Sequence, residues 1–202
     1  MKKQILILSL LLAPAGNFAH AETDPQLESV IQSVANGFYT RDAQKVQKFI
    51  HPQHGYIYWY RIGIPTIQTF ENKSDFNFPH ENAAYPDIWF FNAPNASQKL
   101  IQSSELPTME CDLWNKSGWY YQQHSHKKPF SELIYSYQKN NEISETEMAE
   151  QLHKIQPFES NLAEMQYVGE TRNISDDLHL FFSKIEGKWY LSAFDQSGNC
   201  DA

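Results

Sequence analysis

The sequence predicts an α+β domain in which helices pack on a curved antiparallel sheet. Three patterns support this class: a helical periodicity after residue 24, an alternating aromatic segment at 56–62, and strand-like segments that close the chain. Two helices, a strand, an irregular middle, more helix and a closing set of strands indicate α+β architecture.

Two helices are expected first. The segment after Asp24-Pro25 places apolar residues on one helical face: Leu27, Val30, Ile31, Val34, Ala35 and Phe38. Asp24 supplies an N-cap and Pro25 suits the first turn. A second, shorter helix carries its apolar residues inward and must stop before Pro52, because the residue before a proline is disfavoured in helical geometry.

The next element is a strand over 56–62, where alternation separates two sets of side chains. Tyr56, Tyr58 and Tyr60 share one face, and Ile57, Trp59 and Arg61 share the other. Neither set resembles a solvent face. The elaborated middle, residues 72–129, contains five prolines and is expected to form short strands and loops.

Helical spacing returns at 130–137, and Ser144 followed by Glu147 forms a capping box that opens another helix. We expect that helix to end at Pro157, because proline disrupts a helix interior. Strands are expected over 162–171, 178–185 and 188–195. Glu186-Gly187 predicts a tight turn between the last two strands, with glycine supplying a positive φ.

The N-terminus reads as a cleavable secretory signal peptide of residues 1–21. Lys2 and Lys3 precede an apolar run at 5–12 that is too short to span a bilayer, and Ala19-His20-Ala21 has the small residues that signal peptidase requires. Cleavage after Ala21 predicts a soluble periplasmic or secreted protein, with a single domain over 22–202. The pattern resembles bacterial signal peptides.

Charge limits the classes of partner. The chain has a formal net charge of −8 at pH 7, and removal of Lys2 and Lys3 makes it more negative. Nucleic acid and anionic headgroups need a basic surface, so both are disfavoured. The sequence predicts a small molecule or a protein as partner, no membrane span in the mature chain and no cofactor.

Cys111 and Cys200 are the two cysteines of the chain. Both follow the signal peptide, and a disulfide persists in the oxidising compartment that export implies. We therefore expect a structural Cys111–Cys200 bridge, with two separate buried thiols as the alternative. The spacing excludes a Cys-x-x-Cys redox motif.

Three short segments carry a family resemblance: residues 34–42, His51-Pro52, and residues 186–191. They resemble the two ends of nuclear transport factor two-like domains, a superfamily that includes ketosteroid isomerase and polyketide cyclases. The resemblance implies a cone-like α+β fold whose mouth is a catalytic pocket, a binding site or a dimer surface. Residues 58–63 and the 200–202 ending are also similar to exported bacterial proteins grouped only as a domain of unknown function.

Catalysis has few anchors in the sequence. There is no Gly-x-Ser-x-Gly motif, and a disulfide would leave no free cysteine, so a hydrolase is disfavoured. An isomerase or cyclase needs only one acid or base in an apolar cavity beside a stabilising hydroxyl. The candidates for such a site are Asp195, His179, Tyr58 and Tyr60. The simpler alternative is that the tyrosines pack on the sheet and Asp195 caps a turn.

The sequence also contains candidate residues for ligand binding and for metal binding. Arg61 and Trp59 are candidate ligand-binding residues, because a guanidinium within an apolar strand must reach solvent, a carboxylate or an anion. The pairs His51/His54 and His124/His126 have spacings that two zinc ligands could use, but no third ligand follows and Lys127-Lys128 opposes a dication, so no metal is expected. The sequence favours a non-catalytic binding or accessory protein, with a small-molecule isomerase or cyclase as the alternative.

Overall fold

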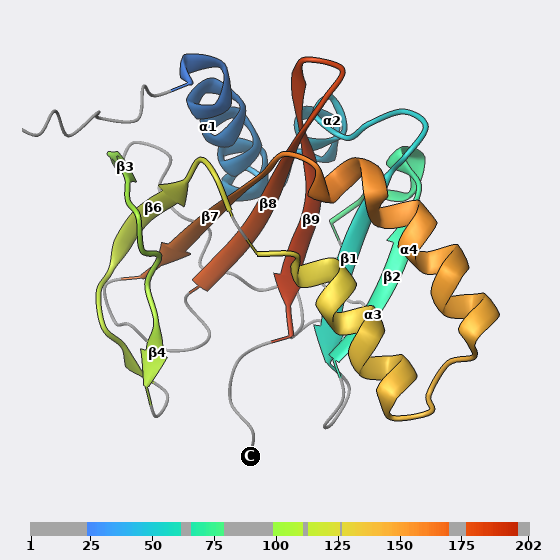
Figure 1. Cartoon of the computed structure of the whole chain (residues 1–202). Coiled ribbons are helices and arrows are strands. Elements are labelled where there is room, and N and C mark those ends of the chain that lie inside the picture. The colour runs from blue at the N-terminus through green and yellow to red at the C-terminus, as the bar shows by residue number, and fades with distance from the viewer. Residues whose placement is uncertain are drawn as a thin grey trace, which may run out of the picture.

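The structure is a computed structural model that describes residues 24–61, 66–78, 99–110, 113–125, 127–169 and 177–197. The expected signal peptide, Cys111, Cys200 and His126 lie outside the described residues, as does the side chain of Arg61. Figure 1 shows helices combined with a large sheet, so the α+β class is confirmed.

The first helix, α1 (Pro25–Tyr39), begins as expected at Asp24, whose side chain accepts hydrogen bonds from the backbone N–H groups of Gln26 and Leu27. The second, α2 (Ala43–Gln47), is short and is capped by Asp42. The two helices approach closely at Gly37, where a Cβ atom would lie 2.6 Å from a Val46 methyl group. A side chain at Gly37 would therefore force the helices apart.

Seven strands form one sheet in the described part of the chain, in the order β2-β1-β9-β8-β7-β6-β3. Their bounds are β1 (Tyr56–Arg61), β2 (Thr66–Glu71), β3 (Leu100–Gln102), β6 (Gly118–Gln122), β7 (Leu162–Val168), β8 (Asp177–Ile185) and β9 (Lys188–Gln196). The expected purely antiparallel sheet is corrected, because β1 runs parallel to β9 and β3 runs parallel to β6. Parallel pairing arises where the chain crosses over before it joins a neighbour, and local sequence patterns do not reveal it.

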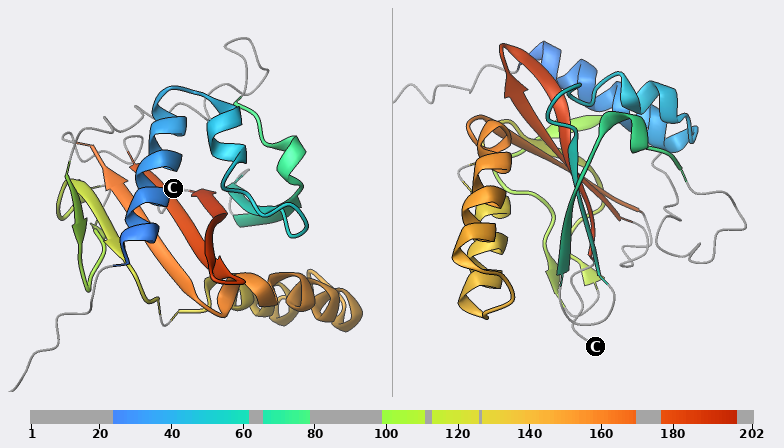
Figure 2. Two further views of the ribbon diagram at one scale, coloured as in Figure 1. Left: turned by 90° about the horizontal axis from the view of Figure 1, so that it is seen from above. Right: turned by 90° about the vertical axis from the view of Figure 1, so that its right-hand side faces the viewer.

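The alternation expected for β1 is confirmed, and it divides the interior into two buried clusters. Tyr56 belongs to a first cluster that joins α1 and α2 to strands β6 to β9, whereas Ile57 and Trp59 belong to a second cluster. The second cluster includes Phe130 and Phe158 from the helices that follow. Both faces of the sheet are therefore partly covered, and Figure 2 shows helices on either side of the strands.

Helices α3 (Pro129–Lys139) and α4 (Glu145–Glu159) lie side by side (Figure 1). The Ser144 hydroxyl accepts a hydrogen bond from the Glu147 N–H, so the expected N-cap is confirmed. The expected end of α4 at Pro157 is wrong, because the helix continues to Glu159. Phe158 is only 1% exposed, and burial of this ring favours the final turn over the local effect of the proline.

The closing hairpin is confirmed, with positive φ angles of 50° at Glu186 and 81° at Gly187 between β8 and β9. The register shifts once, because Phe181 pairs with Ala193 while Phe182 pairs with Leu191. The extra residue is Ser192 on β9, and it lets Leu191 pack in the first cluster and Ala193 in the second, although residues two apart in a regular strand share a face.

Short elements make up the described part of the middle, as expected: a 3-10 turn at Lys73–Asp75 and a hairpin of β4 (Met109–Glu110) with β5 (Leu113–Trp114). The β2 strand was not expected. No helix within the described ranges has the length and apolar character needed to cross a membrane.

Candidate functional site

A row of polar side chains crosses the centre of the sheet, and strand register places them side by side. Tyr120 of β6 pairs with Gln166 of β7, Gln166 pairs with His179 of β8, and His179 pairs with Asp195 of β9. Directly paired residues project from the same face of a sheet. The row is thus fixed by backbone pairing. Glu164 lies two residues before Gln166 and shares its face.

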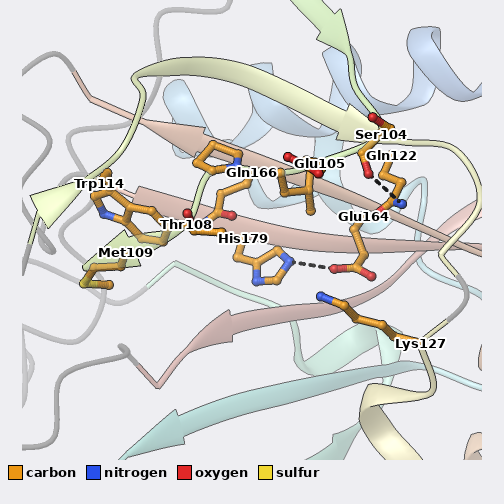
Figure 3. Close-up of a pocket in the computed structure, with 12 residues that line it drawn as sticks. Ser104, Glu105, Thr108, Met109, Trp114, Gln122, Lys127, Glu164, Gln166 and His179 are labelled. Carbon is orange, nitrogen blue, oxygen red and sulfur yellow. Dashed lines mark hydrogen bonds and ion pairs between the residues drawn. The ribbon is translucent and has the colours of Figure 1, made fainter. Parts of the chain in front are cut away.

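Three of these residues, Glu164, Gln166 and His179, line a pocket of about 560 Å³ (Figure 3). Its floor comes from Gln122, Glu164, Gln166 and His179, and the segment 104–109 forms the opposite wall together with Trp114. Small-molecule sites in proteins occupy about 300–1,000 Å³. The pocket therefore has the size of a binding site for a small ligand.

His179 lies between two carboxylates. Its Nδ1 is 3.8 Å from Asp195 Oδ2, and its Nε2 is 3.4 Å from Glu164 Oε2. The ring also packs on Phe181, with centroids 4.3 Å apart. A histidine flanked in this way has a fixed orientation, and when protonated it forms an ion pair on each side.

Glu164 is the most buried acid of the pocket, with 3% of its surface exposed. Its carboxylate accepts a hydrogen bond from the Ser125 hydroxyl. Burial alone would raise its pKa, but pairing with His179, the Ser125 hydrogen bond and the Lys127 charge together lower the pKa of Glu164 below its ordinary value. The group is therefore ionised at neutral pH.

Asp195 caps a turn and also faces His179. Its Oδ1 atom accepts hydrogen bonds of 2.7 Å from the Ser197 N–H and the Ser197 hydroxyl, which is the turn cap expected as the simpler alternative. Its Oδ2 atom faces His179. Asp195 thus holds the end of β9 and orients the imidazole, and it is absent from the pocket lining.

Three polar groups at the pocket make no hydrogen bond with the described residues. The Gln166 amide is one of them; it is not among the fully buried polar atoms, so it is open to the pocket. His179 Nε2 is the second; it is buried and lies 3.4 Å from Glu164 Oε2. The Trp114 indole N–H is buried and also lacks an acceptor. Nearly all buried polar groups in native proteins are hydrogen-bonded, so each of these marks a place where a ligand or water belongs.

Tyr58 and Tyr60 do not join this site. They stack on each other with centroids 5.0 Å apart, and Tyr58 stacks on Phe194 at 4.7 Å, within the first cluster on the opposite face. Burial raises the pKa of the Tyr58 hydroxyl. The structure therefore brings together His179 and Asp195 of the four candidates and separates the two tyrosines from them.

Trp59 lies in the second cluster, where its ring packs on Phe130 and Phe181. Its indole N–H donates a 2.6 Å hydrogen bond to Gln68 Oε1 across the β1–β2 pair. These contacts give Trp59 a structural part in the core. The side chain of Arg61 lies outside the described residues.

The histidine pairs have other partners. His51 stacks on His54 at 4.4 Å, and its Nδ1 atom accepts hydrogen bonds from the N–H groups of Gln53 and His54. Burial, together with the nearby His54, lowers the pKa of His51. In the described ranges, no three histidine, cysteine or acidic side chains lie in an arrangement that would hold a metal.

Glu164 and Gln166 were missed by the sequence reasoning, although a signal exists. Every residue of β7 is buried, and the two polar residues stand at alternate positions in an otherwise mostly apolar strand. A strand with polar residues at i and i+2 on a buried face indicates a polar site on that face.

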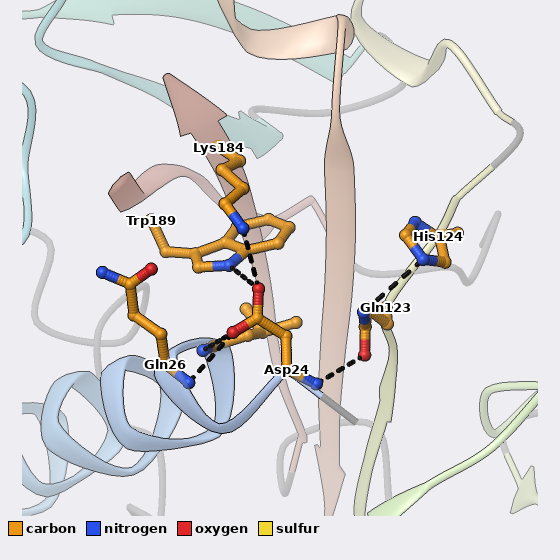
Figure 4. A network of polar contacts seen from close by, with 7 residues as sticks. Asp24, Gln26, Gln123, His124, Lys184 and Trp189 are labelled. Atoms are coloured by element: carbon orange, nitrogen blue, oxygen red, sulfur yellow. Dashed lines mark hydrogen bonds and ion pairs between the residues drawn. The ribbon is translucent and has the colours of Figure 1, made fainter. Parts of the chain in front are cut away.

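A second polar cluster surrounds Asp24, on the opposite side of the sheet (Figure 4). Asp24 Oδ2 accepts hydrogen bonds from Trp189 Nε1 at 2.8 Å and from Lys184 Nζ at 3.0 Å. The hydrogen bond from Trp189, with those from Lys184 and the helix backbone, lowers the pKa of Asp24 from 3.8 to about 2. Asp24, Lys184 and Trp189 all have hydrogen-bond partners within this cluster, so we assign the cluster a structural role.

Comparisons of the chain with protein-family models, with curated proteins and with solved structures gave no match.

Proposed function

We propose that the protein is an exported, non-catalytic binding protein whose ligand is a small molecule held in the pocket over β6, β7 and β8. The observation that carries this proposal is the Gln166 side chain, which lines the pocket and whose amide is open to it without a hydrogen bond to the described residues. Trp114 supplies a second unpartnered group at the same pocket.

A ligand is favoured on energetic grounds. A buried N–H without an acceptor, such as that of Trp114, costs about 1–3 kcal/mol, and the Gln166 amide has no hydrogen bond within the described residues. A fold that needed only stability would place apolar residues at these positions, as it does at the neighbouring Met165 and Tyr167 of β7. The cost is offset when a ligand supplies the missing hydrogen bonds.

The scaffold that we propose is the cone-like arrangement implied by the resemblance to nuclear transport factor two-like domains, with the N-terminal helices packed on a curved sheet. The buried cluster shared by α1 and strands β6 to β9 supports it. Side chains fill that cluster, so the proposed binding site lies on the other face of the sheet. Export after cleavage following Ala21 remains part of the proposal.

An isomerase or cyclase is the second candidate, favoured by the His179–Asp195 pair. An imidazole oriented through Nδ1 by a carboxylate, with Nε2 towards a pocket, is a common arrangement for acid–base catalysis. However, such an enzyme also needs a group that stabilises an enolate. The described pocket lining includes no tyrosine, and Tyr58 and Tyr60 lie on the other face.

The test is to purify the protein from its native compartment and measure its intact mass under native and denaturing conditions. We expect a mass excess that disappears on denaturation and is absent from a Gln166→Leu variant. Gln26→Leu, the same change at an exposed site on α1, should retain the excess. A native mass equal to that of the bare chain, with no small molecule shifting its melting temperature, would contradict the proposal.

A further inference from the structure

We infer that the ligand is a neutral polyhydroxylated molecule, a sugar or polyol, an inference that rests on the proposed binding function. It follows from three independent properties of the pocket: its charge balance, its hydrogen-bonding groups and its apolar side chains.

The charge balance disfavours an ionic ligand. Glu164 is ionised, and the Lys127 ammonium lies beside it (Figure 3). A ligand cation that approached Glu164 would meet Lys127, and it would compete with His179 and Ser125 for the carboxylate oxygens. A ligand anion would meet Glu164 and also Glu105, the second acid of the pocket. Neutral ligands avoid both penalties.

The hydrogen-bonding groups of the pocket require both donors and acceptors from the ligand. The Gln166 amide offers one carbonyl oxygen and two N–H donors, Trp114 offers only a donor, and the Glu164 carboxylate only accepts. A hydroxyl group donates one hydrogen bond and accepts two. Neighbouring hydroxyls on one ring therefore match this mixed set, whereas an ammonium group has no acceptor to offer Trp114.

The lining also contains apolar side chains. Leu106, Pro107 and Met109 line the pocket from the segment 104–109, together with the polar Ser104, Glu105 and Thr108. A sugar ring has hydroxyls at its rim and C–H groups on its faces, so it can contact polar and apolar side chains at once. The cavity of about 560 Å³ has room for such a ring with bound water.

The test is isothermal titration calorimetry with four probe sets: the neutral hexoses glucose and galactose, the disaccharide maltose, the cations choline and putrescine, and the anion citrate. We expect binding of at least one neutral sugar and none of the charged probes. Gln166→Leu should weaken that binding by roughly tenfold or more, because one or two hydrogen bonds are lost. Gln26→Leu should leave it unchanged.

A second variant guards against misfolding. Gln166→Met keeps the length of the side chain, and both Gln166 variants should show the far-ultraviolet circular dichroism of the parent chain. If Leu unfolds the protein, the Met variant carries the test. Binding that survives in a folded Gln166 variant would overturn the site, and with it the proposed function.

The remaining outcomes separate the two proposals. Binding of choline, putrescine or citrate in place of the sugars, with loss in the Gln166 variants, would overturn the neutral class and leave the binding function intact. Failure of every probe, with a ligand of non-carbohydrate mass found on the native protein, would do the same. Failure of every probe and a bare native mass would overturn both.

Discussion

On the face of the sheet whose buried cluster includes α1 and α2, aromatic and aliphatic side chains fill the interior and charged groups are hydrogen-bonded, although the Trp119 indole N–H has no partner among the described residues. Asp24 is the example, since its carboxylate has two side-chain and two backbone donors. On the opposite face, α3 and α4 contribute to a second cluster, and beside it the sheet presents the polar side chains of Glu164, Gln166 and His179 to a pocket.

The difference assigns a different role to each face of the sheet: the face packed against α1 and α2 stabilises the fold, and the other is proposed to bind the ligand. Adjacent residues of each strand alternate between the faces, so β8 sends Leu180 and Phe182 to the filled face and His179 to the pocket. Substitutions on the filled face should therefore cost stability, and substitutions in the polar row should change binding with little effect on stability.

The largest effect is expected for Phe182→Ala. This ring is completely buried in the first cluster, and removing it leaves a cavity that the surrounding strands cannot close. We expect a loss of about 3–5 kcal/mol in the free energy of unfolding, measured by urea denaturation. Tyr135→Ala on α3 is the control, because Tyr135 is 53% exposed and should change stability little. Equal losses in the two variants would contradict the assignment of the core.

The expected Cys111–Cys200 disulfide should affect both stability and the pocket. In sequence, Cys111 stands between β4 and β5, which carry Met109 and Trp114 of the pocket, and Cys200 follows β9 by four residues. A Cys111→Ser, Cys200→Ser double variant should lose about 2–4 kcal/mol and bind ligand more weakly. Non-reducing peptide mapping of the protein purified from its native compartment provides the check. Two free thiols in native protein would refute the bridge.

The sequence predicts the elements whose cause is local. Four features could be predicted because each depends on a few neighbouring residues: the Asp24 cap, the apolar face of α1, the alternation of β1 and the Glu186-Gly187 turn. The parallel pairing of β1 with β9 and the last turn of α4 were not, because they depend on contacts distant in sequence.

The candidate site was predicted in part for the same reason. His179 and Asp195 were chosen from their position among aromatic residues, and register pairs them. Alternation in the sequence shows that Tyr58 and Tyr60 share one face of their strand. It does not show which side of the sheet that face lies on, because this depends on the neighbouring strands. Glu164 and Gln166 acquire their importance only from the antiparallel pairing of β7 with β8.

A smaller effect is expected for Asp24→Asn. Asparagine keeps the N-cap but loses the charge that pairs with Lys184, and the lowered pKa of about 2 corresponds to roughly 2 kcal/mol of stability at pH 7. Because the folded-state pKa lies below the ordinary 3.8, this stabilisation is present above about pH 4 and is lost as the pH falls towards 2. The difference between parent and variant should shrink over that range.

Thermal melting at a series of pH values measures this effect. Asp42→Asn is the matched control, since Asp42 also caps a helix but has an exposed lysine 3.6 Å away as its side-chain partner. It should lose less stability than Asp24→Asn at pH 7. A constant difference between the parent and Asp24→Asn from pH 7 to about pH 2 would show that the carboxylate charge is not what stabilises the cluster.

The smallest effect on stability is expected for Gln166→Leu in the ligand-free protein. The residue is as buried as many in the core, so a purely structural reading predicts a loss when its shape and polarity change. The amide is open to the pocket and has no hydrogen-bond partner in the described residues, however, so leucine removes no internal hydrogen bond. We therefore expect a free energy of unfolding within about 0.5 kcal/mol of the parent, or a small gain.

Urea denaturation of the two proteins, each freed of ligand by unfolding and refolding, makes the measurement. A loss above about 2 kcal/mol would mean that the amide has a structural partner. Gln166 would then contribute to stability, and the proposed division of the sheet into a stabilising face and a binding face would be wrong.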